Sequence, residues 1–154
     1  MTAAKAGPLA ATEPDRVWFR FMRLHQRMLM QMTARIRTLG LSIPQFDLLS
    51  TLTEQEGISQ SELAEKLYVT KGNVSGLVDR LVQAGLVERR AIAGDRRSYA
   101  MHLTPEGRRL AEAGIAAQRD FVASTLGKLK PDDLAELDRL VLLWRDFARA
   151  VDAE

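Results

Sequence analysis

The chain has 154 residues, of which 46% are hydrophobic and 27% are charged, and this balance is typical of one globular domain rather than of a disordered protein. It contains no cysteine, which excludes disulfides, thiolate metal sites, cysteine nucleophiles and thiol-based redox sensing. The first residues lack the apolar core of a secretory signal, and no run approaches the ~20 apolar residues of a membrane span. We therefore expect a soluble, cytoplasmic protein with no membrane partner.

The formal net charge is only +2, but the charges are unevenly distributed. Residues 15–40 contain six arginines and one acid, whereas residues 132–154 contain seven acids and three arginines. One interpretation is two solvated helix faces, and the other is electrostatic matching between the two ends of the chain, within a subunit or across a dimer. The sequence leaves both interpretations open.

Residues 1–14 are rich in Ala, Gly and Pro and predict a flexible leader. A long helix is expected from Asp15 to Leu39, because apolar residues recur there at spacings of three and four on two faces. So wide an apolar surface needs two neighbours, and a partner subunit is the natural second one. The two faces carry Val17, Phe21, Leu24, Met28 and Met32, and then Trp18, Met22, Leu29 and Ile36.

Three shorter helices follow. Ile43-Pro44 begins the first, which runs to about Gln55. Ser59 and Glu62 stand at capping-box spacing and predict the second over ISQSELAEKL. The third is expected from Lys71 to Gln83, with Thr70 as its N-cap and Gly85 beyond its end. Its predicted buried side is Val74, Leu77, Val78, Leu81 and Val82.

Two strands are predicted next, over Leu86–Ile92 and Ser98–Leu103, with a charged turn at residues 94–97 between them. Thr104-Pro105-Glu106 then begins a helix that continues through Leu110, Ala113, Ala117 and Phe121. Pro131 begins the last helix, which extends to Val151. The predicted fold class is mainly α with a small β-hairpin.

Two short helices joined through EKLYVTKG and followed by a hairpin match a winged helix-turn-helix. The exposed residues of the second helix are short hydrogen-bonding side chains and a cation, which suit the phosphates and base edges of double-stranded DNA. The turn of the hairpin would reach the neighbouring minor groove, where a guanidinium gains from the concentrated negative potential. The alternative is an ordinary polar helix start beside a solvated turn. The candidate DNA-binding residues are Ser59, Gln60, Ser61, Thr70, Lys71, Gly72, Asn73, Ser75, Arg80, Asp95, Arg96, Arg97 and Ser98.

The run ISQSELAEKLYVTKGNVSGLVDRLVQAGLVERR, with GDRRS and LTPEGRRL after it, resembles the winged helix-turn-helix core of the multiple antibiotic resistance regulator (MarR) family. The resemblance covers residues 15–151 and implies one domain, in which dimerisation helices at 15–40 and 104–151 flank a DNA-binding region at 41–103. It implies a homodimer on a pseudo-palindromic operator, commonly a repressor, that a small aromatic or phenolic effector releases from DNA. The helix from Lys71 to Gln83 would be the recognition helix, and Asp95, Arg96 and Arg97 the tip of the wing.

Within that tip we expect Asp95 to orient one arginine and either Arg96 or Arg97 to enter the minor groove. An effector pocket could form around the methionines at 28, 30 and 32, since methionine repacks around varied shapes, although methionines at helical spacing are more often core. Its candidate lining is Trp18, His25, Met28, Phe46 and Leu49.

No metal or cofactor is expected, because the two histidines, His25 and His102, lie far apart along the chain. No glycine-rich phosphate loop, nucleophile with a base, or spaced carboxylate pair indicates an enzyme. The alternative function is a winged-helix module that contacts proteins, or a nucleoid-type protein that binds DNA with little sequence preference.

Overall fold

The computed structural model describes residues 13–67 and 71–152. Most of the expected leader at 1–14 and the expected N-cap Thr70 therefore lie outside the described residues. The fold is helical apart from one antiparallel hairpin, which confirms the predicted class. In chain order the elements are α1 (Pro14–Arg37), α2 (Ile43–Glu54), α3 (Gln60–Lys66), α4 (Lys71–Gln83), β1 (Val87–Ile92), β2 (Asp95–Leu103), α5 (Pro105–Ser124), the 3-10 helix η1 (Leu126–Lys128) and α6 (Pro131–Val151).

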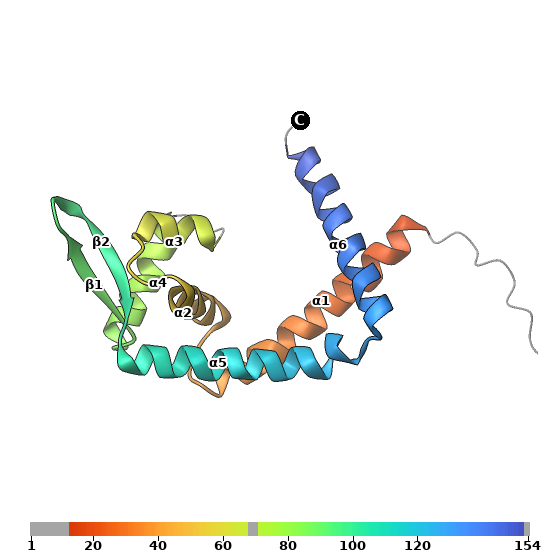
Figure 1. Cartoon of the computed structure of the whole chain (residues 1–154), viewed down its shortest axis with the longest axis horizontal. Coiled ribbons are helices and arrows are strands. Elements are labelled where there is room, and N and C mark those ends of the chain that lie inside the picture. The colour runs from red at the N-terminus through yellow and green to blue at the C-terminus, as the bar shows by residue number, and fades with distance from the viewer. Residues whose placement is uncertain (1–12, 68–70, 153–154) are drawn as a thin grey trace, which may run out of the picture.

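Helix α5 forms the base of the molecule and joins its two ends (Figure 1). At one end α2, α3, α4 and the hairpin form a compact lobe, whereas α1 and α6 lie at the other end. No described helix combines the length and the apolar character that crossing a membrane requires.

The short helices begin where the sequence predicts because their caps form. The Ser59 backbone N–H donates to Glu62 Oε2 at 2.6 Å, and the Glu62 backbone N–H donates to Ser59 Oγ at 3.2 Å. These reciprocal bonds confirm the predicted capping box of α3. Ser42 and Gln45 form a second box at the start of α2.

The hydrophobic core lies almost entirely in the lobe of α2, α3, α4 and the hairpin. Val74, Val78 and Leu81 are fully buried, and Leu77 and Val82 are packed against the core, which confirms the predicted inner side of α4. From α1 only Ile36 is buried, and no described residue of α6 is buried.

Helix α5 approaches the lobe with a face that the apolar pattern indicated only in part. Of the residues expected along its course, Phe121 is buried, whereas Leu110, Ala113 and Ala117 are only partly buried. Small side chains lie inside because the approach is too close for large ones: a Cβ at Gly107 would lie 1.9 Å from the Leu86 carbonyl oxygen. The buried residues of α5 are Gly107, Ala111, Gly114 and Phe121.

Glu56, just after α2, connects the base of the hairpin to α5. Its Oε1 accepts a hydrogen bond from the Leu103 backbone N–H at 2.8 Å, at the end of β2. Its Oε2 accepts one from Arg108 Nη2 at 2.7 Å, in the first turns of α5. One carboxylate therefore holds three elements together.

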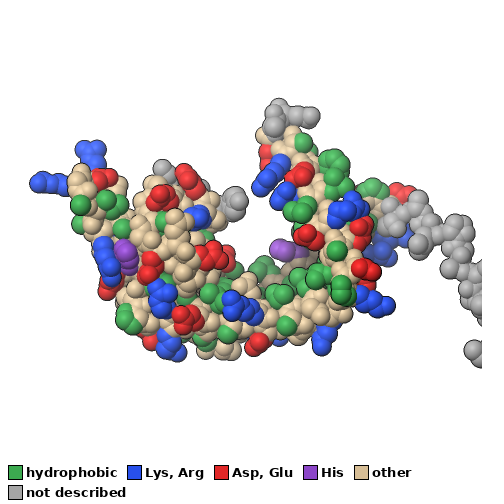
Figure 2. Space-filling view, in the orientation of Figure 1, with side chains coloured by type: hydrophobic (Ala, Val, Ile, Leu, Met, Phe, Trp, Pro, Cys, Tyr) green, Lys and Arg blue, Asp and Glu red, His purple; other side chains and the backbone are tan. Residues whose placement is uncertain are grey.

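Helices α1 and α6 meet through aromatic rings and leave large apolar faces uncovered. The Trp144 ring lies 4.8 Å from that of Phe21 and 6.3 Å from that of Trp18, both edge to face. Hydrophobic side chains gather over α6 in Figure 2, and Phe147 is 64% exposed. Within the described residues no ion pair joins α1 to α6, since the pairs on α6 are local to it. The arrangement therefore does not show the charge matching within one subunit that the sequence left open.

Candidate nucleic-acid interface

The start of α4 presents polar groups on the surface of the lobe. Gly72, Asn73 and Arg80 are exposed, and Ser75 is half-buried. Lys71 is the first residue of α4, and its side chain lies outside what is described, as does Thr70. Because Val74 and Val78 fix the opposite side of the helix in the core, these polar positions face outward.

The hairpin is tighter than the sequence predicts. Gly94 has φ +85°, and this left-handed conformation lets the chain reverse over residues 93 and 94 alone. Strand β2 therefore begins at Asp95, which pairs with Ile92, and not at Ser98. Arg96 and Arg97 belong to β2 but have no partner on β1, because the register shifts from the pair Ala91 and Tyr99 directly to the pair Ile92 and Asp95, so residues 96–98 form a bulge next to the turn.

The tip of the hairpin is basic. Arg96 and Arg97 are exposed, and neither guanidinium forms an ion pair within the part of the chain that is described. Figure 2 shows basic side chains projecting from this tip, away from the rest of the lobe. Two exposed arginines without an ion-pair partner among the described residues are thus held next to the turn of the hairpin.

We expected Asp95 to orient an arginine side chain, but it bonds to the backbone instead. Its Oδ1 accepts a hydrogen bond from the Arg97 backbone N–H at 2.9 Å. This bond first, and a further one from the Ser98 hydroxyl, hold the pKa of the Asp95 carboxylate below its ordinary value. Aspartate commonly bonds to the backbone two residues on, so here it stabilises the turn and leaves both guanidinium groups free.

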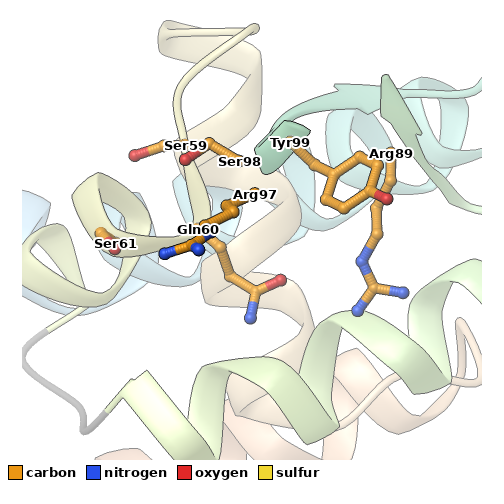
Figure 3. A pocket seen from close by; sticks show the side chains of 7 residues that line it. All are labelled: Ser59, Gln60, Ser61, Arg89, Arg97, Ser98 and Tyr99. Atoms are coloured by element: carbon orange, nitrogen blue, oxygen red, sulfur yellow. The ribbon is translucent and has the colours of Figure 1, made fainter. Parts of the chain in front are cut away.

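A hollow of about 540 Å³ lies between the start of α3 and the hairpin (Figure 3). It brings together two groups of candidate residues that are far apart in the chain, the start of α3 at 59–61 and the strand positions 97 and 98. None of the lining residues is acidic. They are Ser59, Gln60, Ser61, Arg89, Arg97, Ser98 and Tyr99.

Arg89 and Tyr99 belong to this hollow, and sequence reasoning did not single them out. Arg89 pairs in register with the buried Met101, and Tyr99 is two residues from Met101, so both side chains lie on the inner face of the hairpin. Strand alternation was the only sequence pattern that could have indicated them. Arg89 also forms an ion pair with Asp79 of α4.

The five candidate effector-pocket residues do not surround one cavity. Trp18 lines a hollow of about 300 Å³ between α1 and α6, whereas His25 and Met28 line another of about 350 Å³ between α1 and α5. Phe46 and Leu49 are buried in the core, because that face of α2 packs inside the lobe. Among the described residues no group of three or more His, Asp or Glu side chains could hold a metal ion.

Comparison with known proteins agrees with this architecture. The model of the MarR family matches residues 41–99. The HTH-type transcriptional repressor Rv2887 of Mycobacterium tuberculosis is 32% identical over 111 residues, which cover 72% of this chain and 80% of the repressor.

Two similar solved structures show the same fold. The structure of MepR from S. aureus in complex with DNA has a TM-score of 0.77 and 20% identity, and the match covers 86% of this chain and 97% of MepR. The structure of the transcriptional regulator PcaV from Streptomyces coelicolor in complex with its natural ligand has a TM-score of 0.69 and 22% identity, and the match covers 91% of this chain and 99% of PcaV.

Proposed function

Because the chain belongs to the MarR family of DNA-binding transcriptional regulators, we propose that it represses transcription as a homodimer on a pseudo-palindromic operator. Its relatives are regulators and not enzymes. The observation that carries the proposal is the hollow between the start of α3 and the hairpin, whose lining contains two arginines and no acid and is linked to α4 by the Arg89–Asp79 ion pair. A DNA-binding repressor shares a compartment with its operator, and we assign it to the cytoplasm.

The shape of this surface suits B-form DNA. Helix α4 would lie in the major groove, where Gly72 permits close approach and Asn73 and Ser75 can reach base edges or phosphates. The hairpin would lie beside it, with Arg96 or Arg97 in the adjacent minor groove. Free guanidinium groups at the tip support this assignment, because an arginine already paired with Asp95 would carry less charge into the groove.

The uncovered apolar faces of α1 and α6 support the homodimer. A soluble monomer rarely exposes large contiguous apolar patches, and a second copy of the chain is the occupant that the two-fold symmetry of an operator requires. Each subunit would then contact one half-site. The exposed apolar residues on these helices include Val17, Trp18, Phe21, Met22, Leu24, Leu137, Leu140, Val141, Trp144 and Phe147.

The hollow between α1 and α5 supports a small-molecule effector. Its lining is apolar except for His25 and Gln118, and its size of about 350 Å³ suits a small aromatic compound. It lies where the dimerisation helices join α5, so an occupant would contact the elements that set the position of the two lobes.

The test is recovery of genomic DNA fragments bound by the purified protein, followed by titration of the best fragment and of a random duplex at physiological salt. A specific regulator holds its operator typically 10³-fold or more tightly than random duplex. Equal affinity for both would refute the regulator and favour nucleoid-type binding. Light scattering at micromolar concentration tests the homodimer, and a monomeric mass would contradict it.

A further inference from the structure

Arg89 differs from the other arginines of the hairpin in the face on which it lies. In strand β1 it alternates with Arg90, which points to the other side and pairs with Glu88. Arg89 lies on the inner face, diagonally across from Tyr99, and only 27% of its side chain is exposed, against 57% for Arg90. Figure 3 shows Arg89 and Tyr99 on the hairpin side of the hollow and Gln60 and Ser61 on the α3 side.

The ion pair of Arg89 uses only part of its hydrogen-bonding capacity. Its Nη2 contacts Asp79 Oδ1 on α4, and within the described residues this is the one hydrogen bond of the guanidinium group. A guanidinium has five N–H donors in a planar fork that matches two oxygens of a phosphate. Most of these donors therefore remain unused in a hollow that also contains Arg97 and several hydroxyl groups.

We propose that Arg89 binds a backbone phosphate of the DNA in this hollow, while Asp79 holds the guanidinium in place. The inference rests on the proposed function, since the phosphate belongs to the duplex whose groove α4 enters. Asp79 lies on α4 itself, so the phosphate would be held at a fixed position relative to the recognition helix. Arg89 would thereby set the register of the protein on DNA without reading any base.

The test uses the full-length protein and a 40-base-pair random-sequence duplex, because a phosphate contact is independent of sequence. Affinity is measured over a series of KCl concentrations, and each phosphate contact contributes about 0.9 to the slope of log affinity against log salt. We expect Arg89→Met to weaken binding about tenfold or more and to reduce the slope by about 1.8 for the two subunits of a dimer. The matched control is Arg90→Met, which removes the same charge from the outer face and leaves the slope near that of the wild type.

The variant Asp79→Asn distinguishes two roles of Arg89: binding a phosphate, and holding the hairpin against α4 through the ion pair. Both Asp79→Asn and Arg89→Met break the ion pair, but only Arg89→Met removes the cation. We expect Asp79→Asn to lower affinity several-fold with no loss of slope, and Arg89→Lys to restore most of the slope. If Asp79→Asn and Arg89→Met lose slope equally, Arg89 acts only through the ion pair and the proposal is wrong. Should Arg89→Met unfold, Arg89→Gln, which removes the same charge and keeps a polar side chain, takes its place in the salt series.

Two further outcomes are distinguishable. Wild-type protein that binds DNA with the same slope as Arg89→Met would overturn this inference and leave the proposed function standing. Absence of any DNA binding by the wild type would overturn both. Inorganic phosphate at matched ionic strength tests the other source of the anion: phosphate that competes with DNA only when Arg89 is present would support a DNA phosphate in the hollow, whereas phosphate that binds through Arg89 without changing DNA affinity would assign the hollow to a free phosphate and overturn the proposal.

Discussion

Gly107, in the first turn of α5, lies where the winged lobe comes closest to the rest of the chain. A Cβ at this position would be 1.9 Å from the Leu86 carbonyl oxygen and 2.8 Å from its carbon. Real Cβ contacts require at least about 3 Å, so Gly107→Ala forces α5 and Leu86 apart by about 1 Å. Backbone on one side and a helix on the other leave no flexible group to absorb this displacement.

The displacement breaks contacts that fix α5 to the lobe. The Thr104 backbone N–H donates to the Leu86 carbonyl at 3.1 Å, and the Thr104 hydroxyl donates to the Gly85 carbonyl at 2.7 Å. Overpacking costs about 1–3 kcal/mol and each hydrogen bond about 1 kcal/mol, so we expect a loss of about 3 kcal/mol of unfolding free energy. For a chain of this size this corresponds to a fall in Tm of about 6–12 °C.

The measurement is thermal unfolding followed by far-UV circular dichroism, at one protein concentration because the proposed self-association would make Tm depend on concentration. The control is Gly76→Ala in α4, where a Cβ meets no atom within 4 Å. An unobstructed helical Gly→Ala change is expected to stabilise by about 0.5–1 kcal/mol. Equal Tm values for the two variants would refute the close approach of α5 to Leu86.

Three further predictions concern DNA, the dimer and pH. Arg96→Ala and Arg97→Ala are each expected to weaken operator binding and flatten its salt dependence with no change of mass in light scattering; unchanged affinity in both would contradict their assignment to the groove. Trp144→Ala removes the ring that joins α6 to α1 and should raise the dimer dissociation constant in a dilution series, and an unaltered constant would count against this interface. The pKa of Glu62 is lowered chiefly by the Ser59 backbone N–H, so its stabilisation is present at neutral pH and is lost as pH falls below about 4.5. Urea unfolding of Glu62→Gln should therefore depend less on pH in this acidic range than that of the wild type, and parallel curves would exclude the effect.

Local sequence patterns predicted the features that depend on neighbours along the chain. The capping box of Ser59 and Glu62, the bounds of α4 and the buried side with Val74 and Val78 follow from spacing within one or two turns. Their energies come from bonds and contacts within each helix or directly beneath it. A stretch of one or two helical turns is therefore enough to predict these features from the sequence.

Features that depend on the approach of distant elements were missed. Gly107 and Gly114 contribute no hydropathy, so the apolar pattern of α5 did not indicate them, although a Cβ at either position would collide with Leu86 or Phe46. Arg89 acquires its position from strand pairing and from Asp79 on another element. For the same reason the five candidate effector-pocket residues lie in two separate hollows and in the core, because helical periodicity does not predict which faces of two helices contact each other.

Helix α5 and the wing also form one stiff arm. Only Thr104 separates β2 from α5, and Glu56 bonds to both Leu103 and Arg108 across this junction. The 20 residues of α5 extend about 30 Å, so a rotation of about 5° at the α6 end displaces the other end by about 3 Å. That displacement is about half the width of a minor groove, which is about 6 Å. In the proposed dimer, the angle between two such arms would therefore determine whether both wings reach DNA at once.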